Sequence, residues 1–181
     1  TSDEIKTKPT QHSVQALRSM GIQPDSIICR SEKEVDQSVK DKISLYCDVP
    51  PVNVISLKDF KSVYDIPIHL EDQGLGKIVE SKLGFKKKKP NLSRWEKLCS
   101  NIHKAKESID IGLVGKYVEL PDSYLSVTEA IKHAAANNSS QVNIKWIDSD
   151  NLSSNNINNL GELSGIVVPG GFGERGISGM I

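Results

Sequence analysis

Short β-branched segments alternate with longer amphipathic segments along this chain, and the alternation constrains its fold more than any other feature of the sequence. In the first half, residues 26–29 and 53–57 are centred on apolar, β-branched pairs, as buried strands often are. Between them, apolar residues recur at steps of three to four, which predicts a helix. That helical stripe is Val39, Ile43 and either Tyr46 or Cys47. Strands that alternate with helices form parallel sheets, so the sequence predicts an α/β fold.

Two more helices are expected before the middle of the chain. Thr10 is predicted to cap a helix over residues 11–20, which Gly21 ends because glycine is favoured just after a helix. A further apolar stripe at helical spacing is formed by Leu75, Ile78, Val79 and Leu83.

A charged, proline-containing stretch then interrupts the pattern at residues 86–91, which read K-K-K-K-P-N. Ser93 and Glu96 have the spacing of a capping box, and Trp95, Leu98, Cys99 and Ile102 follow at helical spacing, so the interruption is expected to end in an amphipathic helix. We therefore expect a first domain over residues 1–85, a linker over 86–108 and a second domain over 109–181.

The second half repeats the alternation. Strands are expected at 109–114, 142–147 and 165–168, with a helix at 124–135 after the first of them. The polar run Ser153-Ser154-Asn155-Asn156 is expected to be a mobile loop. The second half is thus predicted to be a second parallel-sheet domain.

Charge and cysteine usage exclude several classes of protein. Lys plus Arg and Asp plus Glu number 23 each, so the net charge of zero offers no global attraction to nucleic acid or to a membrane, and the lysine run reads as a solvated linker. Three widely spaced cysteines, Cys29, Cys47 and Cys99, indicate neither a disulfide framework nor a zinc site. We expect a soluble protein of a reducing cytoplasm, because the apolar runs are far shorter than a membrane span.

The stretch from Lys6 to Gln11 is the most informative part of the first half. It places two lysines, two threonines and an amide immediately before a helix start, where free N–H groups and the helix dipole attract anions such as phosphate. A frayed terminal arm with an ordinary helix cap is the alternative interpretation.

A glycine-dense turn over residues 167–176 follows the last predicted strand. Such a turn lets main-chain N–H groups approach a ligand closely, because glycine has no side chain and tolerates positive φ. Taken as a bare turn, it is equally compatible with a structural role.

Several of these segments together resemble the CTP synthase family. They are K-T-K-P-T-Q-H-S-V, G-I-Q-P-D-S-I-I-C-R-S, K-I-S-L-Y-C, I-S-L-K-D-F, G-L-V-G-K-Y-V-E-L-P-D-S-Y-L-S-V and P-G-G-F-G. The last is similar to the oxyanion and glutamine-binding loop of class I glutamine amidotransferases. The resemblance implies the end of a parallel-sheet, P-loop-type synthetase domain, a linker helix, and the start of a class I glutamine amidotransferase domain.

The resemblance also implies roles for particular residues. UTP, and CTP as feedback inhibitor, would be bound by Lys6, Thr7, Lys8, Pro9, Thr10, Gln11 and Lys42. ATP would be bound by Lys58, Asp59 and Phe60, with Arg30 a weaker candidate, and ligands of open α/β sheets do lie at the carboxyl ends of strands. Oxyanion stabilisation and glutamine binding would fall to Gly170, Gly171 and Phe172, and the GTP activator would approach Arg175 and Gly176.

For each of these groups a plainer interpretation exists. On the residues alone, Lys42 reads as a surface lysine of an amphipathic helix, and residues 58–60 read as turn residues at a strand end. Lys116 and Tyr117, also at a strand end, are expected either to help couple the two domains or to be structural. The four histidines have no spacing that suggests a catalytic pair and are expected to be structural, namely His12, His69, His103 and His133.

By resemblance, the parent enzyme uses ATP and Mg²⁺ to activate UTP, takes ammonia from glutamine, responds to GTP and assembles as a homotetramer. The family's phosphate-binding P-loop and magnesium carboxylates would lie before Thr1, and its nucleophilic cysteine after Ile181. Residues 1–181 alone are therefore expected to catalyse neither reaction. Two alternatives stay open, a non-catalytic pyrimidine-nucleotide-binding module and a different amidotransferase with the same glycine loop.

Overall fold

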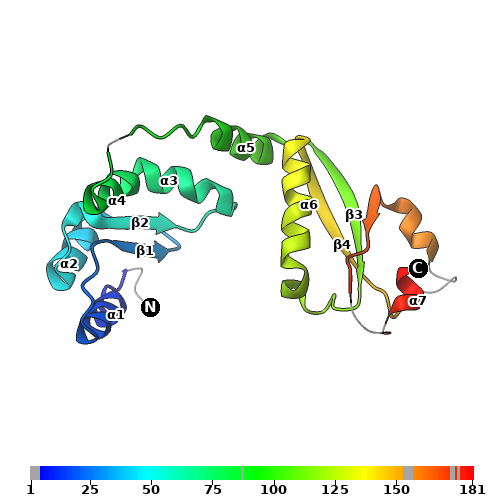
Figure 1. The fold of residues 1–181 in the computed structure, drawn as a ribbon, viewed down its shortest axis with the longest axis horizontal. Helices are drawn as coiled ribbons and strands as arrows, with labels where there is room; N and C mark the ends of the chain where they lie inside the picture. Colours follow the sequence, from blue (N-terminus) through cyan, green and yellow to red (C-terminus); the bar gives the residue numbers. More distant parts are fainter. Residues whose placement is uncertain (1–4, 87, 153–156, 172–173, 175) are drawn as a thin grey trace. The chain divides into compact units, whose positions relative to one another are not determined.

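The computed structural model describes residues 5–86, 88–152, 157–171, 174 and 176–181. The chain divides into two compact units, Thr1–Leu92 and Ser93–Ile181. Each unit contains its own sheet, and every strand pairing is parallel (Figure 1). The prediction of an α/β fold with parallel sheets is confirmed.

The first unit is built on a two-stranded sheet in which Ile27 of β1 faces Val54 of β2 and Ser31 faces Lys58. Its core joins both strands to two helices through six buried side chains, Val14, Ile27, Ile43, Cys47, Val49 and Val54. Two short 3-10 turns flank β2, at Pro51–Asn53 and Val63–Asp65. The strands and helices are α1 (Lys8–Ser19), β1 (Ile27–Ser31), α2 (Gln37–Cys47), β2 (Val54–Lys58), α3 (Ile66–Asp72) and α4 (Leu75–Leu83).

The expected cap at Thr10 is wrong. Helix α1 begins three residues earlier than a cap at Thr10 implies, at Lys8, with Thr7 in the N-cap position. The reason is Pro9, whose fixed φ suits the first turn of a helix and whose missing N–H is not needed there. Thr10 therefore lies inside the first turn.

Burial decides which residue completes the α2 stripe. Cys47 is fully buried, whereas Tyr46 is 56% exposed. The stripe expected on α4 forms a helix as predicted, but Val79 and Leu83 remain exposed in this unit.

Asp36 caps α2, because its carboxylate accepts a hydrogen bond from the Val39 N–H at 2.9 Å. This bond and a second from the Ser38 hydroxyl lower the pKa of Asp36 below its ordinary 3.8. A depressed folded pKa stabilises the protein above the unfolded value, and the contribution is lost as the pH falls through the folded pKa.

We expect Asp36→Ala to lower the melting temperature at pH 7, because a capping oxygen is lost. Asp36→Asn is the matched control, since it keeps the oxygen but does not titrate. The advantage of the wild type over Asp36→Asn should shrink as thermal melts are repeated at pH values below 3.8. An advantage that stays constant across this range would contradict the assignment.

The second unit has a three-stranded sheet of order β4-β3-β5. Leu113 and Val114 of the central strand are buried, and Ala135 and Ala136 of α6 are buried with them. Helix α5 belongs to this unit, since the Asn101 side-chain amide donates to the Ala136 carbonyl at 3.1 Å. Two 3-10 turns lie at Pro121–Tyr124 and Ile157–Glu162. The strands and helices are α5 (Ser93–Lys104), β3 (Glu107–Gly115), α6 (Leu125–Asn137), β4 (Ser140–Asp148), β5 (Gly165–Val167) and α7 (Ile177–Met180).

Among the described residues, no helix has both the length and the apolar character needed to cross a bilayer. The run 153–156, expected to be a mobile loop, lies outside the described residues.

Candidate functional site

The amino end of α1 leaves main-chain donors available. Thr7 is 5% exposed, and its hydroxyl accepts a hydrogen bond from the Gln11 side-chain amide at 3.0 Å instead of capping the helix. The first-turn N–H groups consequently have no side-chain cap, which is the condition under which a helix start binds an anion. Lys6 and Lys8 flank this end with exposed side chains.

Pro9 and Thr10 complete the first turn of α1, with Pro9 exposed and Thr10 half-buried. Lys42 lies on α2 beside Ile43, which packs in the same core cluster as Val14 of α1. Helices α1 and α2 therefore adjoin, and the Lys42 side chain is exposed.

The other four predicted site residues of the first unit lie together at the carboxyl edge of its sheet. They are Arg30, Lys58, Asp59 and Phe60. Arg30 Nε lies 2.9 Å from Asp59 Oδ1, across the ends of β1 and β2. Lys58 Nζ lies 5.7 Å from the centre of the Phe60 ring. These ends lie side by side in Figure 1, as the parallel pairing requires.

The ion pair of this strand-end cluster contributes little to stability. The Arg30 and Asp59 side chains are 79% and 47% exposed, and exposed ion pairs typically contribute only ~0–1 kcal/mol. A basic, aromatic-containing group whose ion pair adds little stability is a candidate for ligand binding, particularly at the carboxyl end of parallel strands.

Two residues behind the cluster were not expected from the sequence. The His69 ring meets the Phe60 ring edge-on, with centroids 5.0 Å apart. The Gln73 side-chain oxygen accepts the Ser56 N–H at 2.9 Å, which ties β2 to the end of α3. A structural role for His69 accords with these contacts, and only the folded chain reveals that it supports Phe60.

In the second unit, Gly170 and Gly171 follow β5 and are exposed. Lys116, 6% exposed, lies along this turn, because a Cβ built on Gly171 would be 3.4 Å from its Cε. Lys116 Nζ is also 5.2 Å from the centre of the Tyr117 ring. The buried ammonium group therefore lies against the glycine turn, an arrangement that the sequence did not indicate.

The end of β3 is fixed by Tyr124. Its hydroxyl oxygen accepts hydrogen bonds from the N–H groups of Lys116 and Tyr117, at 3.1 and 3.3 Å. Gly115 permits this approach, since a Cβ there would overlap the tyrosine hydroxyl. Phe172, Gly173 and Arg175 lie outside the described residues, and Gly176 has a φ of +74°.

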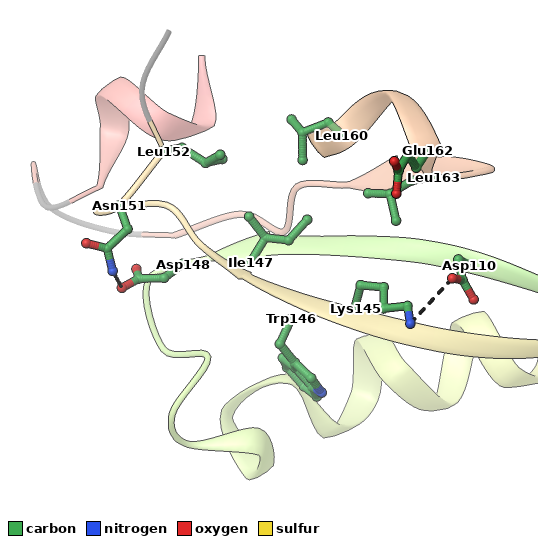
Figure 2. Close-up of a pocket in the computed structure, with 10 residues that line it drawn as sticks. All are labelled: Asp110, Lys145, Trp146, Ile147, Asp148, Asn151, Leu152, Leu160, Glu162 and Leu163. Carbon is green, nitrogen blue, oxygen red and sulfur yellow. Dashed lines mark hydrogen bonds and ion pairs between the residues drawn. The ribbon is translucent and has the colours of Figure 1, made fainter. Parts of the chain in front are cut away.

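A cavity of about 450 Å³ lies between β4 and the Ile157–Glu162 turn (Figure 2). One side carries an ion pair of Lys145 with Asp110 at 3.4 Å, and Ile147 is drawn on the same side of β4 as Lys145. The pKa of Asp110 is lowered, first by a hydrogen bond from the Asn143 amide and then by Lys145. The ten lining residues are Asp110, Lys145, Trp146, Ile147, Asp148, Asn151, Leu152, Leu160, Glu162 and Leu163.

The described residues contain no group of three or more His, Cys, Asp or Glu side chains placed to hold a metal ion.

Family comparisons divide the chain in the same order as its two units. Residues 1–85 match the family model described as CTP synthase N-terminus. Residues 119–181 match the model described as Glutamine amidotransferase class-I.

Curated relatives named CTP synthase align with almost the whole chain. The protein from Methanocaldococcus jannaschii is 47% identical over 185 residues, which are 98% of this chain and 34% of the relative. The protein from Ruminiclostridium cellulolyticum is 49% identical over 181 residues, 99% of this chain and 34% of the relative. The protein from a Hydrogenobaculum species is 50% identical over 178 residues, 98% of this chain and 33% of the relative. The chain thus spans about a third of the length of the relatives it matches.

Proposed function

The chain belongs to the CTP synthase family, and from this premise we propose that the complete protein converts UTP to CTP with ATP and with ammonia taken from glutamine. One observation carries the proposal. A segment that matches the CTP synthase N-terminus is followed, in the same chain, by a segment that matches class I glutamine amidotransferases. One segment would use the nitrogen that the other releases.

In the first unit, we assign the pyrimidine nucleotide to the amino end of α1. The uncapped N–H groups of its first turn and the exposed Lys6 and Lys8 suit a triphosphate. The Thr7 to Gln11 hydrogen bond holds the Gln11 amide at that end of the helix. Pro9 and Thr10 would shape the same turn, and Lys42 would add a charge from α2.

We assign ATP to the strand-end cluster of Arg30, Lys58, Asp59 and Phe60. Phe60 offers an aromatic face for the purine, and the cations suit the charge of the nucleotide. Mg²⁺ would reach this site with the ATP phosphates, since magnesium is usually held by substrate phosphates and only one or two carboxylates.

In the second unit, we assign oxyanion stabilisation and glutamine binding to Gly170, Gly171 and the residue that follows them in the sequence, Phe172. Arg175 and Gly176 would lie near GTP acting as an allosteric activator. We further propose a homotetramer and a cytoplasmic location, the latter in keeping with three free thiols in the chain.

The test uses the complete protein in a CTP-formation assay with UTP and Mg-ATP. Either glutamine or ammonium salt serves as the nitrogen source. We expect CTP with both, because added ammonia bypasses glutamine hydrolysis, and residues 1–181 alone should give none. A different amidotransferase would instead hydrolyse glutamine without any selectivity for UTP over other nucleotides.

Lys58→Met should raise the KM for ATP about tenfold, because a charged hydrogen bond to the nucleotide is lost. The KM for UTP should change less than about twofold, since UTP is assigned to a different set of residues. Steady-state kinetics with each nucleotide varied in turn would measure both values.

Lys61→Met is the control, because Lys61 is an exposed lysine of the same loop that is outside the assigned cluster. Equal changes in the two variants, or a larger change in the KM for UTP, would contradict the assignment.

A further inference from the structure

Ser149 carries a buried hydroxyl group whose role the fold does not explain. It follows β4 directly and is 1% exposed. Its Oγ has no hydrogen-bond partner among the described residues. Buried polar groups nearly always have partners, so an unpaired hydroxyl at this depth needs an explanation.

The surroundings of Ser149 link it to the segment that follows the glycine turn. Its N–H donates to the Gly115 carbonyl at 3.0 Å, which places it at the carboxyl edge of the sheet. A Cβ on Gly176 would overlap the Ser149 Oγ, and a Cβ on Gly179 would overlap the Ser149 carbonyl oxygen. Gly176 and Gly179 therefore lie directly against Ser149, with no room for a side chain at either position.

Ser149 is also held firmly. Asp148 accepts the Asp150 N–H at 3.0 Å with one carboxylate oxygen and the Asn151 amide at 2.7 Å with the other. The second of these bonds is drawn in Figure 2. The turn that carries Ser149 is thus fixed by a side chain of the strand before it, so the hydroxyl is presented from a rigid position.

We propose that Ser149 is a positioning residue for glutamine use, a role that rests on the function proposed above. Its hydroxyl makes a hydrogen bond with the main chain that follows the glycine turn when glutamine occupies the site. The bond fixes the position of the glycine turn relative to the end of β3. Gly171 lies against the buried Lys116 there. Ser149 acts through the turn and does not touch the reacting atoms.

The test compares Ser149→Ala with Ser149→Cys in the complete protein, by measuring glutamine hydrolysis and CTP formation from glutamine and from ammonium salt. Ser149→Ala should lower kcat with glutamine about tenfold, the size of one lost hydrogen bond. It should change the rate with ammonium less than about twofold. Ser149→Cys keeps a weak donor of similar volume and should give an intermediate rate.

Ser126→Ala is the matched control, since Ser126 is exposed on α6. A full glutamine rate in Ser149→Ala would overturn the role of Ser149 alone. Equal losses of rate with glutamine and with ammonium would show that Ser149 is merely structural and would also overturn the positioning role. A lowered melting temperature that accounts for the loss would do the same. A wild-type protein that hydrolyses no glutamine would overturn both this role and the proposed function.

Discussion

Gly171→Pro is expected to lower the glutamine-dependent rate of CTP formation by ~10²–10³, the usual loss when one oxyanion donor is removed. Proline has no N–H, so the substitution deletes the main-chain donor proposed for the tetrahedral intermediate. The rate with ammonium salt should stay within about twofold of the wild type. Parallel assays with the two nitrogen sources measure the effect.

Gly171→Ala separates the missing N–H from the added side chain. Gly171 has no positive φ, and an added Cβ would meet Lys116 Cε at 3.4 Å, an ordinary contact. The alanine variant should therefore keep most of the glutamine-dependent rate. Equal losses in the alanine and proline variants would show that the Gly171 N–H is not the donor.

Leu113→Ala should lower the free energy of unfolding of the second unit by ~2–5 kcal/mol, as large-to-small changes in a core do. Leu113 is fully buried in the central strand, between Trp146 of β4 and Val167 of β5 in the sheet register. The smaller side chain leaves a cavity at a fully buried position of the central strand. Denaturant unfolding of the chain, followed by Trp fluorescence, would measure the loss.

Leu120→Ala is the control for this prediction, because Leu120 is 63% exposed. It should change the unfolding free energy by less than about 0.5 kcal/mol. If both leucine variants unfolded at the wild-type denaturant concentration, Leu113 would not be part of a cooperative core.

The sheets could be predicted because β-branched segments separated by helical stripes have few other ways to bury their apolar faces. The residues at which the strands begin are harder to predict. Strands β3 and β4 each begin two residues before the expected position, at Glu107 and Ser140. These first residues pair through their main chains and are polar, so hydrophobicity gives no sign of them.

The strand-end cluster illustrates what topology adds to sequence. Arg30 and Asp59 are far apart in the chain, but parallel strands end at the same edge, so their meeting follows once both strands are recognised. The Thr10 cap failed for a local reason, since Pro9 lets the helix start earlier. Ser149, by contrast, could not be predicted as a site residue. Its burial depends on how three strand ends and a turn pack together, and no residue spacing in the sequence predicts that packing.

Cys47 and Cys99, a buried cysteine in each unit, provide a probe of how the units open, whereas Cys29 is only partly buried. Burial raises the pKa of the Cys47 thiol and is also the main cause of the raised pKa of Cys29. Cys99 is buried in the other unit. Alkylating reagents attack the thiolate, so they should modify these side chains chiefly in molecules whose unit has transiently opened. The rates of labelling at Cys47 and Cys99 would therefore report the opening equilibria of the two halves of the chain separately.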